Sequence, residues 1–208
     1  MLAPTLAATA TGLAAVFLIP QIVRLIIRGD TAGVSLVWAG FGVITNIAWV
    51  GYLGMMGLWA AVAAPALAVV TYGVMLAVLG PLDRGSGWLR TSVVYAALLA
   101  AVGPTAGGAG LGLVLAITPA VQLTPQVIAV FRAERPSGVA PTTWCLALAE
   151  AALWGCYGWL MRDAALIGYG LVTSLGSVLI LARWTATRPR WRTPVTAPLP
   201  PVEVAVGG

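Results

Sequence analysis

Two short segments of the chain hold the residues best suited to bind a small polar molecule. They are Glu150, Trp154 and Tyr157 in one segment and Asn46, Trp49 and Tyr52 in the other. An indole ring offers a flat apolar face, and a carboxylate or an amide offers hydrogen-bonding groups. At about 3.6 residues per helical turn, each set can turn its side chains toward an interior cavity. The residue types therefore predict a binding pocket with aromatic walls and few polar groups.

Glu150 is the only acidic residue inside the long apolar stretches of the sequence. A charge near the centre of a bilayer is costly, so such a residue is by default a functional hypothesis. A carboxylate there could bind a proton and couple a process to the proton gradient. The alternative is a structural contact, in which Glu150 forms a hydrogen bond between helices.

The composition predicts that these segments lie in a membrane. Of the 208 residues 60% are apolar and 8% are charged, whereas a soluble domain carries about 25% charged residues. A membrane-spanning helix needs about 20 mostly apolar residues. Glycine and proline break the longest apolar stretches, notably between Gly103 and Gly110. Seven spans are expected, near residues 2–23, 35–56, 59–80, 91–103, 109–131, 140–161 and 164–182.

The arginines predict the orientation of these spans. With the N-terminus outside, ten of the eleven basic residues fall on the cytoplasmic side, and Arg162 remains outside. The cytoplasmic ones are Arg24, Arg28, Arg84, Arg90, Arg132, Arg135, Arg183, Arg188, Arg190 and Arg192. Most tryptophans near the expected span ends should form an interfacial belt. These are Trp38, Trp59, Trp88, Trp159, Trp184 and Trp191.

The chain repeats itself at an offset of 105 residues without a gap. The matched pairs are Leu18 and Leu123, Pro20 and Pro125, Gln21 and Gln126, Gly33 and Gly138, Val34 and Val139, Trp49 and Trp154, and Tyr52 and Tyr157. The offset covers four expected spans, so both copies point the same way. The expected fold is all-α, with seven transmembrane helices as two parallel three-helix bundles joined by a linker helix. The parts are a first repeat over 1–82, a loop and linker helix over 83–107, a second repeat over 108–183 and a disordered tail over 184–208.

The repeated motifs carry a family resemblance. The segments "PQIVRLIIRGDTAGVSLVW" and "TPQVIAVFRAERPSGVAP" resemble the PQ-loop superfamily, and the segments "NIAWVGY" and "ALWGCYG" look most like the SWEET and SemiSWEET (MtN3/saliva) sugar transporters. This resemblance implies that Pro20, Gln21, Pro125 and Gln126 act as hinges for alternating access. It also implies a role for Trp49 and Trp154 in a sugar pocket.

One feature of the sequence departs from that family. SWEET proteins carry a pocket asparagine in the third helix of each bundle, but the corresponding residues here are Pro65 and Gly170. Other residues of the third helices could supply hydroxyl groups instead, namely Thr71, Tyr72, Tyr169, Thr173 and Ser174.

The leading expectation is therefore a transporter in the plasma membrane that moves a small solute, with a mono- or disaccharide favoured, by alternating access without ATP. The alternative is a proton-coupled PQ-loop carrier of amino acids or amines that uses Glu150. A third reading is a receptor without transport activity, as in the KDEL receptors of the same superfamily. No catalytic constellation, metal-binding spacing, nucleic-acid-binding pattern or cofactor motif is visible, so an enzyme is not expected. The expected partners are the solute and the lipid bilayer, and both a monomer and a homo-oligomer are compatible with the sequence.

Overall fold

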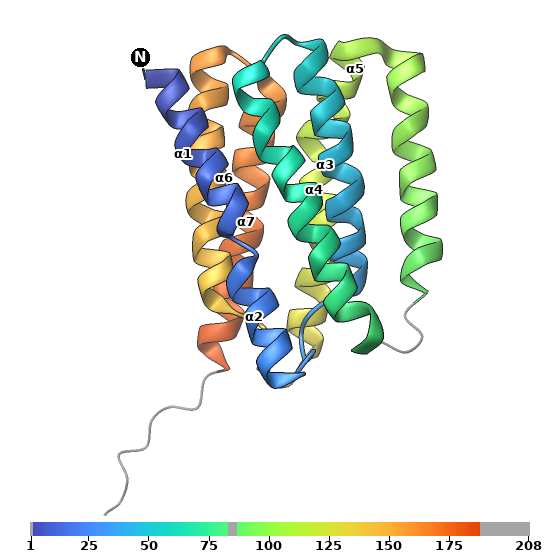
Figure 1. Ribbon diagram of the computed structural model, residues 1–208, viewed down its shortest axis with the longest axis vertical. Helices are drawn as coiled ribbons and strands as arrows, with labels where there is room; N and C mark the ends of the chain where they lie inside the picture. Colours follow the sequence, from blue (N-terminus) through green and yellow to red (C-terminus); the bar gives the residue numbers. More distant parts are fainter. Residues whose placement is uncertain (1, 83–86, 188–208) are drawn as a thin grey trace, which may run out of the picture.

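The computed structural model describes residues 2–82 and 87–187, and its secondary structure over these residues is entirely helical (Figure 1). The expectations for Arg84, Trp191 and the arginines beyond residue 187 lie outside the described residues. The same holds for the expected tail over 188–208. The last helix continues to Ala186, which is already inside the segment expected to be tail.

The first span is broken, contrary to the single helix expected over 2–23. Helix α1 covers Leu2–Val16, and helix α2 covers Ile19–Arg28 after two residues that belong to neither helix. Pro20 lies in the first turn of α2 and has no N–H to donate to the carbonyl of Val16. The chain therefore restarts its helix at the proline. Helix α2 then ends at Gly29, whose φ of 60° suits glycine.

The two helices that follow match their expected ranges closely. Helix α3 covers Leu36–Met55, and its N-cap residue Ser35 accepts a hydrogen bond from the backbone N–H of Trp38. Helix α4 covers Trp59–Leu79 and is followed by the short 3-10 helix η1, Gly80–Leu82.

Helix α5 covers Trp88–Arg132 and joins two expected spans. Its only backbone angles outside the helical region are those of Gly107, with φ 61° and ψ −168°. Figure 1 shows the resulting two arms, which meet at the upper end of the molecule. The break expected between Gly103 and Gly110 is thus a kink at one glycine, which tolerates a positive φ.

Helices α6, Pro141–Met161, and α7, Ala164–Ala186, complete the bundle. Asp163 caps α7 through a hydrogen bond from the backbone N–H of Leu166 at 2.9 Å.

The helices pack in two similar groups. Helix α4 contacts both α1 and α3, and α7 contacts both α5 and α6. Between the groups, α1 contacts α6 and α3 contacts α5 (Figure 1). Each group is therefore joined to the other by two different pairs of helices.

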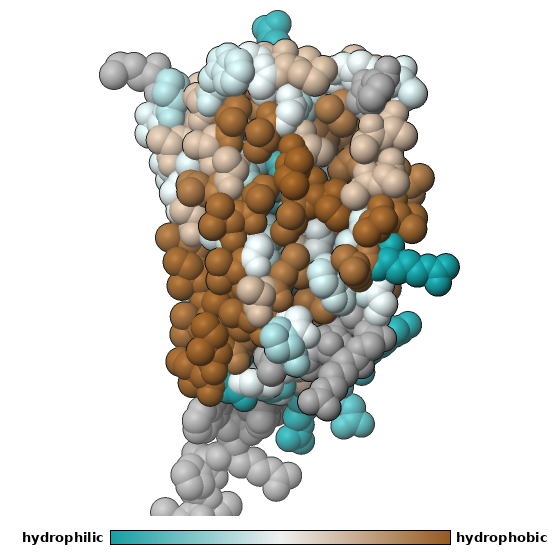
Figure 2. Space-filling model, turned by 45° about the vertical axis from the view of Figure 1, so that its right-hand side comes forward, coloured by the Kyte–Doolittle hydropathy of each residue, from teal (hydrophilic) through white to brown (hydrophobic). Residues whose placement is uncertain are grey.

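The described chain has five helical stretches long and apolar enough to cross a membrane. They are Leu2–Arg28, Leu36–Met55, Trp59–Leu79, Thr105–Arg132 and Ala164–Ala186, and Trp88–Val102 forms a shorter apolar helix. Apolar residues cover much of the side of the molecule, and polar residues gather near its ends (Figure 2). Large exposed side chains such as Ile27, Leu113 and Leu171 suit contact with lipid chains. The apolar helices fit a transmembrane protein.

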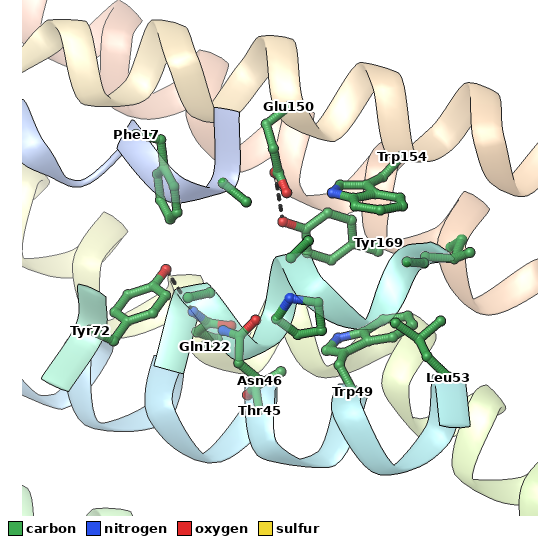
Figure 3. Close-up of a pocket in the computed structure, with 16 residues that line it drawn as sticks. Phe17, Thr45, Asn46, Trp49, Leu53, Tyr72, Gln122, Glu150, Trp154 and Tyr169 are labelled. Atoms are coloured by element: carbon green, nitrogen blue, oxygen red, sulfur yellow. Dashed lines mark hydrogen bonds between the residues drawn. The ribbon is translucent and has the colours of Figure 1, made fainter. Parts of the chain in front are cut away.

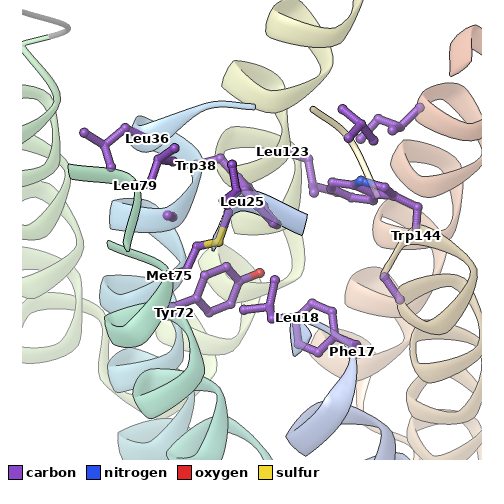
Figure 4. Close-up of a cluster of buried hydrophobic side chains, with 14 of the residues drawn as sticks. Phe17, Leu18, Leu25, Leu36, Trp38, Tyr72, Met75, Leu79, Leu123 and Trp144 are labelled. Carbon is purple, nitrogen blue, oxygen red and sulfur yellow. The ribbon is translucent and has the colours of Figure 1, made fainter. Parts of the chain in front are cut away.

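Three apolar clusters fill the described interior: two large ones, one toward each end of the bundle, and a small one of Phe41, Tyr95 and Leu99. The cluster in Figure 4 includes Leu18, Trp38, Met75 and Trp144. Trp38 is only 1% exposed, so its expected place in an interfacial belt is wrong. It packs against the ring of Trp144 with 5.3 Å between centroids, because the neighbouring helices cover this end of α3.

Candidate functional site

A cavity of about 550 Å³, a volume that includes the space open to solvent, lies between the two large apolar clusters. Four of the six predicted binding residues line it: Asn46 and Trp49 from α3, and Glu150 and Trp154 from α6 (Figure 3). The two pairs point toward each other from opposite walls. The cavity therefore has one wall from each expected repeat.

The two predicted tyrosines lie beside the cavity and do not line it. Tyr52 packs edge-on against Trp49 at 5.6 Å and 83°, and Tyr157 packs edge-on against Trp154 at 5.5 Å and 87°. The two repeats thus support their cavity tryptophans with the same aromatic contact. Trp49 also meets the ring of Tyr169, from α7, at 5.8 Å.

Glu150 is the polar centre of the cavity. It is 5% exposed, and its carboxylate accepts a hydrogen bond from the hydroxyl of Tyr169 at 2.8 Å. The indole N–H of Trp154 is a second donor to it. Nearby, Gln122 donates to the hydroxyl of Tyr72 at 3.0 Å, and both residues line the cavity. The sequence predicted Tyr72 and Tyr169 as sources of hydroxyl groups. Gln122 was not predicted, although an amide within an apolar stretch is the feature that could have indicated it.

The wall from α3 carries no charge. Thr45 occupies the repeat position of Glu150, and its hydroxyl is within 2.7 Å of the hydroxyl of Tyr95, on the first arm of α5. Asn46 donates its amide N–H to the carbonyl of Gly42 at 2.8 Å, which leaves its amide oxygen available to a ligand.

The positions that lack the family's pocket asparagine differ in their surroundings. Pro65 lines the cavity. Gly170 packs so tightly against α6 that a Cβ there would lie 2.7 Å from the Cα of Gly155. An asparagine side chain does not fit at Gly170 unless the two helices separate.

A second hollow of about 350 Å³ continues from the cavity toward the lower end of the bundle in Figure 1. Both hollows are lined by Phe17, Tyr72, Gln122, Glu150 and Tyr169. The second one is also lined by Trp38 and Trp144, whose rings contact each other at an angle of 37°.

The predicted hinge glutamines connect the two repeats at this lower end. Gln21 donates to the carbonyl of Gly138 at 2.8 Å and accepts from the backbone N–H of Ala140 at 2.8 Å. Gln126 donates to the carbonyl of Gly33 at 2.7 Å and accepts from the backbone N–H of Ser35 at 2.8 Å. Both glutamines are 1% exposed. We call this reciprocal arrangement, in which every partner lies 105 residues from its counterpart, the glutamine clamp.

The two predicted hinge prolines differ in the helix geometry around them. Pro20 lies at the break between α1 and α2. Pro125 lies within α5, where Gly107 is the one residue with non-helical angles. Only the first of the two prolines therefore accompanies a helix break.

Exposed polar contacts surround the clamp. Ser137 donates its hydroxyl to the carboxylate of Asp30 at 2.6 Å, and the guanidinium of Arg24 donates to the carbonyl of Ser137. The hydrogen bond from Ser137, together with the one from the backbone N–H of Ala32, lowers the pKa of the Asp30 carboxyl below its ordinary value of 3.8. Gly138 fits this junction because a Cβ would lie 2.6 Å from the carbonyl oxygen of Asp30.

Among the described residues, one side-chain hydrogen bond joins the repeats at the upper end of Figure 1. The hydroxyl of Tyr52, on α3, donates to the carboxylate of Asp163, the cap of α7, at 2.8 Å. The repeat counterpart of this contact does not exist, because the residue 105 positions before Asp163 is Leu58.

Within the part of the chain that the structure describes, no group of three or more His, Cys, Asp and Glu residues could hold a metal ion. No family model matches the sequence, and comparisons with curated proteins and with solved structures give no match.

Proposed function

We propose that this chain is a PQ-loop membrane transporter, most similar to the SWEET group, that moves a small solute by alternating access without ATP. A mono- or disaccharide is the favoured solute. The observation that carries the proposal is the position of the cavity. Trp49 and Trp154 face it from the two repeats, and separate inter-repeat hydrogen bonds lie at the two ends of the bundle.

The packing of the helices supports a 3+1+3 arrangement of seven spans. In each proposed bundle the third helix, α4 or α7, contacts both of its partners. The contacts between the bundles are also related by the repeat. The contact of α1 with α6 corresponds to the contact of the second arm of α5 with α3. A parallel repeat of this kind is a known transporter design, with the substrate site near the midplane between the repeats.

The chemistry of the cavity suits a sugar. The faces of Trp49 and Trp154 can stack on the apolar face of a sugar ring. The oxygens of Asn46 and Glu150 can accept hydrogen bonds from its hydroxyls. In the membrane, we place the protein in the plasma membrane with its N-terminus outside and the glutamine clamp toward the cytoplasm, as the arginines predict.

Alternating access requires the two ends of the bundle to open in turn. The glutamine clamp has to open for the solute to leave toward the clamp, and the Tyr52–Asp163 contact has to open for it to leave at the other end. The hydrogen bonds at both ends are few and local, so a rocking motion of one bundle against the other can break one set while the other set persists.

Solute counterflow in proteoliposomes tests the proposal. We expect wild type to exchange radiolabelled hexose and Trp154→Ala to lose at least about ten-fold of the rate, which corresponds to the loss of about 1.4 kcal/mol of interaction with the solute. Trp159→Ala is the matched control, because Trp159 lies on the same helix and is 75% exposed. Equal rates in wild type and Trp154→Ala contradict the proposed site, and no exchange of any sugar by wild type contradicts the sugar transporter.

Glu150 favours a second candidate function, that of a proton-coupled carrier of amino acids or amines. The carboxylate lines the cavity and has no basic neighbour among the described lining residues, so it is placed to bind a proton together with a solute. Proton coupling predicts that an imposed pH gradient alone drives uptake of the solute by wild type and not by Glu150→Gln. Exchange that is independent of the gradient supports the uncoupled sugar transporter.

A further inference from the structure

The carboxylate of Glu150 accepts hydrogen bonds inside the cavity and has further acceptor positions. Its two donors within the cavity are the Tyr169 hydroxyl and the Trp154 indole N–H. A carboxylate that accepts hydrogen bonds from both suits its ionised form, which has about four acceptor positions on its two oxygens. About two of these positions remain for a ligand.

In the described part of the chain, no basic side chain lines the cavity beside this carboxylate. Among the described residues that line the two hollows, none is basic, and the sequence contains no histidine and only arginine as a basic residue. An ionised carboxylate that is 5% exposed is costly without a partner of opposite charge. A cationic solute would provide that partner.

The aromatic walls of the cavity also favour a cation. A cation is attracted to the face of an indole within about 6 Å of the ring centre, and tryptophan is the best side chain for this contact. Trp49 and Trp154 bound the cavity on opposite sides, and Trp154 stands one helical turn from Glu150 (Figure 3). The indole N–H of Trp49 is buried and has no partner, so it can donate to a hydroxyl of the same solute. The site can therefore hold a ring with hydroxyl groups and one ammonium.

We propose that the cavity selects an amino sugar in its ammonium form, bound through its ammonium to Glu150 with its ring between Trp49 and Trp154. This inference rests on the proposed transport function and names its substrate class. Neutral hexoses bind the same place without the ion pair and are exchanged more slowly. Sugars that carry a carboxylate or a phosphate are excluded, because the cavity holds a negative charge and no basic group.

Glu150→Gln is the variant that isolates the charge, since it keeps the size and one hydrogen-bonding oxygen of the side chain. Counterflow of glucosamine, glucose and glucuronate would be compared in proteoliposomes at about pH 6, below the ordinary pKa of such amines. We expect wild type to exchange glucosamine about ten-fold faster than glucose, which corresponds to about 1.4 kcal/mol, and glucuronate not at all. In Glu150→Gln, glucosamine should fall to the rate of glucose, while the glucose rate changes less than about two-fold. Glu134→Gln is the control, because Glu134 is an exposed acid outside the cavity.

The outcomes separate this inference from the function on which it rests. Equal exchange of glucosamine and glucose by wild type, or an equal loss of both in Glu150→Gln, overturns the amino-sugar inference and leaves the sugar transporter intact. Failure of both sugars to exchange in wild type overturns both. If Glu150→Gln does not fold, quenching of tryptophan fluorescence in wild type decides the matter: glucosamine must bind about ten-fold more tightly than glucose, and equal affinities overturn the inference.

Discussion

The glutamine clamp and the cavity use the same repeat in opposite ways. At the clamp, Gln21 and Gln126 make the same two hydrogen bonds to equivalent backbone groups of the other repeat. In the cavity, both Glu150 and its counterpart Thr45 are lining residues, but Glu150 brings a carboxylate, whereas the hydroxyl of Thr45 contacts Tyr95 of the first arm of α5. Only the tryptophan pair is shared by both walls.

In the proposed transporter, this difference separates the residues that permit movement from those that recognise the solute. Two bundles that rock against each other need equivalent contacts on both sides of the axis, and the clamp supplies them. A solute such as a sugar has no two-fold symmetry, so a site that holds it in one orientation gains from unlike walls. The repeat is therefore kept at the glutamine clamp, and in the cavity it is kept only at the tryptophan pair.

The largest effect on stability is expected from replacing either glutamine of the clamp. Gln21→Leu and Gln126→Leu should each lower the free energy of unfolding by about 2–3 kcal/mol, because each leaves a buried backbone N–H and C=O without a partner. Thermal unfolding in detergent measures this loss. The two variants should agree within about 0.5 kcal/mol, and a silent substitution at either glutamine would show that the two halves of the clamp are not equivalent.

A smaller effect is expected at the end where the repeats differ. Tyr52→Phe removes the hydrogen bond to Asp163 and keeps the ring against Trp49, so it should cost about 1 kcal/mol. Tyr157→Phe, its repeat counterpart, should cost less, because the hydrogen bond to the Asp163 carboxylate comes from Tyr52, and Tyr157 lies near that carboxylate without such a bond. The same unfolding assay compares them. A larger loss for Tyr157→Phe than for Tyr52→Phe contradicts the assignment of this end to a single contact.

The smallest effect is a dependence on pH at the rim of the clamp. The pKa of the Asp30 carboxyl is lower in the folded protein than its ordinary value of 3.8, so its contribution to stability is present above that value and is lost as the pH falls through the folded pKa. Because Asp30 is largely exposed to solvent, we expect less than about 1 kcal/mol. The stability difference between wild type and Asp30→Asn should be measurable at about pH 7 and vanish at about pH 2. A difference in stability between wild type and Asp30→Asn that grows as the pH falls would contradict this account.

Much of the cavity was predictable from the spacing of residues in the sequence. The repeated Trp49 and Trp154 and the single Glu150 line it together with Asn46, because helical periodicity fixes which side chains share a face. Tyr52 and Tyr157 share that face only partly and pack beside the tryptophans, whereas Leu53, the neighbour of Tyr52, does line the cavity.

The clamp was beyond prediction from the sequence. The side-chain amide of Gln21 meets a backbone carbonyl 117 residues away, and backbone groups leave no pattern of residue types that could reveal such a partner. The burial of Trp38 was mispredicted for a related reason. A position near the end of a span indicates depth in the membrane, but it does not indicate which neighbouring helices cover it. Gly107 was one of several residues at which the break in α5 could have formed.

A disulfide across the clamp tests alternating access most directly. The side chains of Asp30 and Ser137 meet at 2.6 Å, so Asp30→Cys with Ser137→Cys brings two thiols within reach of a bond. The exposed Cys145 and Cys156 would first be replaced by serine. Oxidation of this variant should abolish solute counterflow, and reduction of the same proteoliposomes should restore it. Counterflow that continues at an unchanged rate in fully cross-linked protein would contradict the account, because the clamp would then have no part in transport.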